Sequence, residues 1–115
     1  MNQNTDQSVN RLIIAVIHEQ DVETATNAIS NLGLRANRLP STGGLLGQRN
    51  ATLLIALKID QEPDLLQAIR QSCRTRIEYV TLPVEGSPLP IPSPAPITVG
   101  GATIFTFDLE YYEEF

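Results

Sequence analysis

The chain has 115 residues, a length typical of one domain that buries a core without metal or disulfide support. Its formal net charge of −5 argues against broad binding to nucleic acid or anionic membranes, which requires clustered lysine and arginine. The single cysteine excludes an intramolecular disulfide and a multi-cysteine metal site. Cys73 is expected to be a small buried residue; the alternative is a reactive thiol whose pKa is lowered by Arg74 and Arg76.

Residues 1–10 are polar and are expected to form a disordered tail before a single domain spanning residues 11–115. They lack the basic region and apolar core of a signal peptide. No apolar run approaches the roughly 20 residues of a membrane span. A cytoplasmic location is therefore expected.

The first half of the domain has the pattern of strand, helix and strand. The β-branched run Leu12–Ile17 predicts a buried central strand. A helix is predicted next, with Asp21 capping its start and Gly33 ending it. Its apolar residues recur at helical spacing: Val22, Ala25, Ile29 and Leu32. The short segment Leu34–Leu39 has the length of a strand and is stopped by Pro40.

The second half repeats this order. Ala51–Leu57 predicts a strand and Asp60–Cys73 a helix, with Leu65, Leu66, Ile69 and Cys73 facing inward. A short strand is predicted at Ile77–Leu82. Six prolines between Pro83 and Pro96 predict an extended polyproline-like loop, either an ordered surface loop or a recognition site for a partner. Val99–Leu109 predicts a last strand, which is entered through two glycines.

This order indicates an α+β, ferredoxin-like βαβ-βαβ subunit with an extra C-terminal strand. Such a subunit has an antiparallel four-stranded sheet with both helices on one face. The other face would be exposed, and burying it generally requires another subunit, so a homo-oligomer is expected. The exposed face alone is compatible with either a dimer or a trimer.

A glycine-bearing segment, Ser41–Asn50, lies between two predicted strands, within a stretch from Thr24 to Leu57 that has three arginines and no acid. Glycines allow a ligand to approach the backbone, and arginine binds phosphate through two parallel hydrogen bonds. The segment is therefore a candidate anion or nucleotide site. The alternative is an ordinary solvated loop.

Few residues suggest catalysis. His18 follows a buried strand, and no serine or cysteine has a recognisable catalytic partner. Glu113 and Glu114 are adjacent and so diverge on a helix or strand. The sequence lacks the spaced set of histidines and cysteines that would bind a metal ion. The sequence favours a binding protein over an enzyme; for the enzyme alternative, Glu114 and His18 are the acid–base candidates.

Several blocks, in order along the chain, together resemble the PII-like cyclic di-AMP receptor family, also called PstA or DarA. They are Leu12–Val16, Gly33–Leu46, Asn50–Leu54 and Val99–Phe105, and the resemblance runs from Arg11 to Phe115. The Ser-Thr-Gly-Gly stretch and the Val-Gly-Gly-Ala-Thr-Ile-Phe stretch are specific in combination.

The resemblance implies a homotrimer that binds its cyclic dinucleotide in the clefts between subunits and signals through mobile loops. The loops fall at residues 43–50, a short one, and residues 74–98, a large proline-rich one. The implied ligand-binding residues are Arg35, Gly44, Leu45, Leu46, Asn50 and Phe105, and Arg49 and Arg38 are additional candidates for stacking on a base. No cofactor is implied besides the nucleotide.

Four positions differ from the family pattern. They are Asn37 for a threonine, Leu45 for an aromatic residue, Ala56 for a glycine, and Glu114 for a glutamine. Losing an aromatic platform costs roughly 1–3 kcal/mol per stacked base. A carboxylate near a phosphodiester repels it, and the methyl group of Ala56 would crowd a purine.

Two functional hypotheses follow. The first is a trimeric sensor for cyclic di-AMP or another adenine nucleotide. The second is a trimeric interaction scaffold that has lost nucleotide binding and works through the proline-rich loop or the acidic tail Asp108–Phe115.

Overall fold

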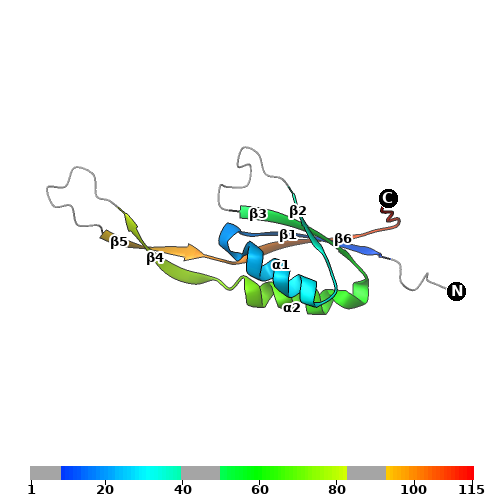
Figure 1. The fold of residues 1–115 in the computed structure, drawn as a ribbon, viewed down its shortest axis with the longest axis horizontal. Coiled ribbons are helices and arrows are strands. Elements are labelled where there is room, and N and C mark those ends of the chain that lie inside the picture. Colours follow the sequence, from blue (N-terminus) through cyan, green and yellow to red (C-terminus); the bar gives the residue numbers. More distant parts are fainter. Residues whose placement is uncertain (1–8, 40–49, 83–92) are drawn as a thin grey trace.

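The structure is a computed structural model that describes residues 9–39, 50–82 and 93–115 (Figure 1). The expected N-terminal tail and most of the glycine-bearing segment lie outside these residues. The elements in chain order are β1 (Arg11–His18), η2 (Glu19–Asp21), α1 (Val22–Asn31), β2 (Ala36–Arg38), β3 (Asn50–Leu57), η3 (Ile59–Gln61), α2 (Glu62–Ser72), β4 (Arg76–Leu82), β5 (Ser93–Val99) and β6 (Ala102–Asp108).

A four-stranded antiparallel sheet in the order β2-β3-β1-β6 forms the body of the chain, and both helices cover the same face of it (Figure 1). This arrangement is consistent with the predicted ferredoxin-like α+β fold. The predicted extra C-terminal strand is not confirmed, because the C-terminal strand β6 is itself the fourth strand of this sheet. The predicted strand at Ile77–Leu82 exists as β4, but it pairs with β5 in a separate two-stranded sheet.

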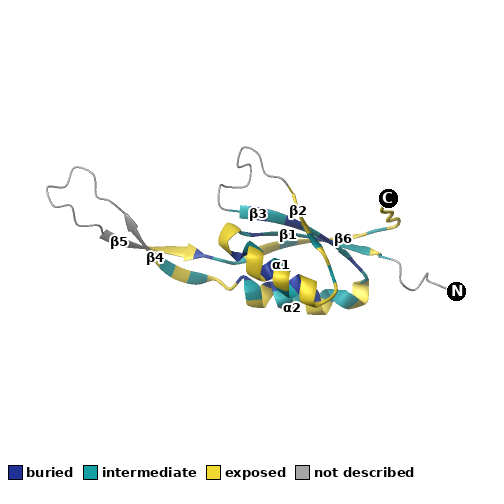
Figure 2. Cartoon of the chain, in the orientation of Figure 1, coloured by how far each residue is buried: buried dark blue, intermediate teal, exposed yellow. Residues whose placement is uncertain are grey.

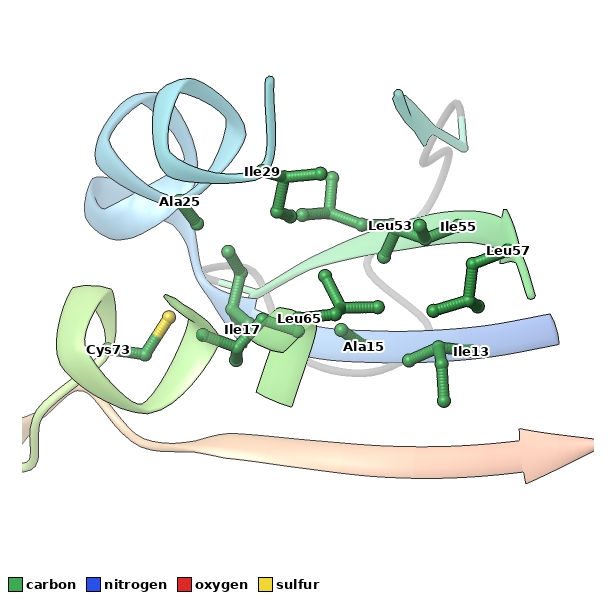
Figure 3. Close-up of a cluster of buried hydrophobic side chains, with 11 residues drawn as sticks. Ile13, Ala15, Ile17, Ala25, Ile29, Leu53, Ile55, Leu57, Leu65 and Cys73 are labelled. Atoms are coloured by element: carbon green, nitrogen blue, oxygen red, sulfur yellow. The ribbon is translucent and has the colours of Figure 1, made fainter. Parts of the chain in front are cut away.

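The core lies between the sheet and the helices. Burial alternates along β1 and β3, because successive strand side chains point to opposite faces. Figure 3 shows the inward side chains of β1 and β3 meeting those of α1 and α2. The fully buried large side chains are Ile13, Ile17, Ile29, Leu53, Ile55, Leu57 and Leu65.

The predicted helices are present with slightly different ends. Gly33 has a φ of 81°, and its N–H bonds to the carbonyl of Ser30 at 2.9 Å, so it terminates α1 as expected. Asp21 is the N-cap residue of α1, as predicted, but its side chain makes no cap hydrogen bond. No helix in the described parts is long and apolar enough to cross a membrane.

The two-stranded sheet of β4 and β5, here called the arm, projects from the body (Figure 1). Part of the expected loop at residues 74–98 is therefore strand, including Pro94 and Pro96 within β5. The arm joins the body through Gly100 and Gly101, whose φ angles are 90° and 84°. At Gly100 an added Cβ would overlap the Arg74 carbonyl oxygen, so only glycine fits there.

Candidate functional site

The edge strand β2 presents the first candidate residues. Ala36 packs against the core, so its neighbours Arg35 and Asn37 point to the sheet face away from the helices. Asn37 is in register with Leu54 of β3. Arg38 instead pairs with Glu19 beside the helix layer, with 2.6 Å between Nη2 and Oε1. Arg35 and Asn37, but not Arg38, therefore belong to the uncovered side of the sheet.

We call the uncovered side of the sheet the open face, and besides Arg35 and Asn37 it presents a set of apolar residues. They are Leu12, Ile14, Val16, Leu54, Ala56, Phe105 and Phe107, and those on β1 and β3 alternate with buried residues. Leu54, Ile14 and Phe105 form one row across three strands. Phe105 and Phe107 remain 48% and 47% exposed on β6. Two sequence-predicted residues, Ala56 and Phe105, therefore share this face with Arg35 and Asn37.

The C-terminal segment crosses from one sheet edge to the other. After β6 the N–H of Leu109 bonds to the carbonyl of Asn10 at 2.9 Å. The chain end then lies on the far side of the sheet from α2 (Figure 1), where Glu114 forms an ion pair with Arg35, 2.8 Å from Oε2 to Nη2. The Tyr112 hydroxyl donates to the other carboxylate oxygen of Glu114 at 3.4 Å. Glu114 thus neutralises the candidate anion-binding arginine within the same chain.

Other predicted residues lie apart from this cluster within one chain. Phe105 is on the edge strand β6, three strand spacings or about 14 Å from Asn37 on β2. Asn50 begins β3 opposite His18, about 17 Å along the strand from Ile55, the partner of Ala36. Gly44, Leu45, Leu46 and Arg49 lie outside the described residues.

A cavity of about 300 Å³ lies at the Asn50 end of the sheet. It is lined by the end of β1, the start of β3 and the start of β6: Val16, Ile17, His18, Asn50, Gly100, Gly101, Ala102 and Thr103. The Nδ1 atom of His18 accepts the backbone N–H of Gln20 at 3.3 Å and so caps η2. His18 therefore has a structural role at the strand end, and Asn50 is the predicted ligand-binding residue that meets this cavity.

A polar cluster at the root of the arm was not predicted from the sequence. The buried carboxylate of Asp21 pairs with Arg76, 2.9 Å from Oδ1 to Nη2, and Arg76 also donates to the Arg74 carbonyl at 2.9 Å. A partner 55 positions away has no local signal in the sequence. Burial, followed by the nearby Asp21 carboxylate, raises the pKa of Cys73 to about 11, although Arg76 acts in the opposite direction. Cys73 is thus an inert buried thiol rather than a nucleophile.

Comparison with known proteins identifies the family. A crystal structure of a functionally unknown protein from Pediococcus pentosaceus ATCC 25745 is similar to this chain, with a TM-score of 0.71 and 27% sequence identity. The similarity covers 93% of this chain and 98% of the other. The family model described as "Cyclic-di-AMP receptor" matches residues 10–115, nearly the whole chain. The chain therefore belongs to the cyclic-di-AMP receptor family.

Proposed function

We propose that this protein is a PII-like signalling receptor that binds cyclic di-AMP or a related adenine nucleotide in clefts between the subunits of a homotrimer. Family membership supports the ligand class. The observation that carries the inter-subunit site is the separation of Asn37 and Phe105 on opposite edge strands of the open face. A β6 edge from one copy beside the β2 edge of another would bring these residues into one cleft.

The open face supports assembly independently. A row of Leu54, Ile14 and Phe105 has no covering element among the described residues, and exposed apolar patches of this kind usually mark contacts between chains. The trimer follows from family resemblance, because the apolar face does not by itself choose between two and three subunits.

In this proposal Arg35 binds a phosphate and the open face contacts the bases. Arg35 is 71% exposed at its side chain, so a ligand can reach it. Phe105, half exposed, supplies an aromatic ring that can stack on a base. The signal would pass through the segments at residues 43–50 and 74–98, and we infer a receptor function without catalysis.

Calorimetric titration of the full chain with cyclic di-AMP tests the proposal, with ATP and cyclic AMP as comparison ligands. Binding of cyclic di-AMP at one site per subunit is expected, and Arg35→Ala should weaken it at least tenfold because an arginine–phosphate contact is lost. Arg38→Ala is the matched control, since Arg38 is three residues away in the chain but pairs with Glu19 on the helix side. No heat with any nucleotide, from protein of verified assembly, would refute the proposal.

One observation favours a second function, an interaction scaffold that has lost its nucleotide. The Glu114 carboxylate stands where a phosphate would approach Arg35. Under this alternative Arg35→Ala changes neither nucleotide binding nor partner binding, so the same titration separates the two functions.

A further inference from the structure

The arm has two strand edges, and its prolines make them unequal. In an antiparallel pair, residues alternate between positions that exchange hydrogen bonds and positions whose N–H and C=O groups point outward. Pro96 is in register with Tyr79, and Pro94 with Thr81. Because proline has no N–H, both pairs must be of the non-bonded type. The backbone bonds of the arm therefore run through the intervening pairs, such as Glu78 with Ile97.

The pairing of β4 with β5 determines which backbone groups face outward from the arm. On β5 they belong to Pro94, Pro96 and Thr98, so this edge has one N–H donor among three residues. On β4 they belong to Ile77, Tyr79 and Thr81, each with an N–H and a C=O. No backbone hydrogen bond occupies these β4 groups among the described residues. The β5 edge is thus blocked against strand addition, whereas the β4 edge is open to it.

The two faces of the arm also differ, because one contacts the body and the other is exposed. At the root of the arm, one face is held by the body, through the Arg76–Asp21 ion pair and through the Gln20 amide donating to Glu78 at 3.1 Å. The opposite face presents Ile77 and Tyr79, which are 63% and 71% exposed. A two-stranded ribbon without a covered apolar face is marginally stable in water. The open edge and the exposed apolar face both lie on β4.

We propose that the β4 edge pairs antiparallel with the β4 edge of a second copy of this chain, about a two-fold axis at Tyr79. The outward positions 77, 79 and 81 are symmetric about Tyr79, so the donors of one copy meet the acceptors of the other. The product is a four-stranded ribbon in the order β5-β4-β4-β5. Ile77 and Tyr79 of both copies gather on one of its faces.

One feature selects the register of a second copy, and another ends the assembly at two arms. The two-fold at Tyr79 places Glu78 opposite position 80, whereas an axis at Glu78 would set two carboxylates directly against each other, which is destabilising. The proline-blocked β5 strands form both outer edges of the ribbon, so addition stops at two arms. This pairing is independent of the nucleotide site and of the trimer, because the arm contains none of the candidate ligand residues that the structure describes.

Sedimentation of the full chain over a wide concentration range tests this pairing. The unmodified chain should reach at least twice the mass of its basic assembly as concentration rises. Tyr79→Pro should remain at the basic mass, because it removes an outward N–H while leaving the bonds between β4 and β5 intact. Thr98→Pro makes the same change on the outward edge of β5 and should still double. A constant mass for the unmodified chain, or loss of doubling in Thr98→Pro, would overturn the proposal.

Amide hydrogen exchange gives a second test that needs no variant. The N–H groups of Ile77 and Tyr79 should exchange more slowly as concentration rises, while that of Thr98 should not change. Fast exchange at Ile77 and Tyr79 at every concentration would mean that this edge takes no second copy. Slow exchange only after adding a different extended peptide would assign the edge to another partner and would equally refute self-pairing.

Discussion

The body and the arm use similar residue types in opposite ways. In the body, isoleucines and leucines of β1 and β3 are buried by two helices, and Ile55 has no exposed surface. In the arm, Ile77 and Tyr79 lie on a two-stranded sheet and are mostly exposed. Figure 2 shows exposed residues on both strands of the arm. The body thus contains the main apolar core of the described residues. Apolar residues of the arm are available for contacts outside the chain.

The largest expected effect separates the two regions directly. Ile55→Ala should reduce the free energy of unfolding by about 2–5 kcal/mol, because it removes a fully buried side chain. Ile77→Ala should change it by less than about 0.5 kcal/mol, because that side chain is exposed. Urea denaturation at a protein concentration too low for association measures both. Equal losses would show that the arm is part of the same cooperative core.

The junction between the regions allows a matched pair of glycine substitutions. Gly100→Ala adds a Cβ next to the Arg74 carbonyl and forces a left-handed backbone, so a loss of about 3 kcal/mol or more is expected. Gly33→Ala has the same backbone strain but no atom within 4 Å of the new Cβ, so about 1 kcal/mol is expected. Thermal denaturation compares them. Similar losses would mean that the arm root shifts easily against the body.

Cys73 predicts an alkaline weakening of this same junction. Its pKa rises from 9.0 to about 11 on folding, so the folded chain holds a proton that the unfolded chain releases in that range. The contribution of this thiol is fully present below pH 9.0 and is lost as pH rises to about 11. Unfolding followed across this range should show a smaller pH dependence in Cys73→Ala than in the unmodified chain. An identical dependence in both would contradict the burial of the thiol.

Local patterns were sufficient to predict the body. Apolar runs predicted β1 and β3, and the helical spacing of Ala25 and Ile29 predicted the inner face of α1. These residues meet in the core and hold the sheet and helices together. The pairing of β4 with β5 was not predictable in the same way, because it depends on how the chain turns at Gly100. The prolines of β5 suggested a loop, but they occupy non-bonded positions where a strand tolerates them.

The candidate site shows the same limit. Family resemblance pointed to Arg35, Ala56 and Phe105, and the strand periodicity explains why all three lie on the open face. The ion pair between Arg35 and Glu114 depends on how the chain turns after β6, which no local pattern records. Pairs that join distant segments, such as this one and Asp21 with Arg76, therefore required the structure.

The smallest expected effect concerns the tail, which is exposed like the arm but attached to the body through Arg35. Glu114→Gln should raise the affinity for cyclic di-AMP by up to about fivefold at low salt, because an exposed ion pair contributes roughly 1 kcal/mol or less. The gain should shrink at high salt. Titration calorimetry measures it, with Glu113→Gln as the control of equal charge.

A double-mutant cycle decides whether Glu114 acts through the arginine. In an Arg35→Ala background, Glu114→Gln should bring no further gain, because the carboxylate then has no cation to occupy. An equal gain in both backgrounds would mean that Glu114 repels the ligand directly through its charge. The tail would then act on the ligand directly, as the exposed face of the arm acts on a partner, and not through its ion pair with Arg35.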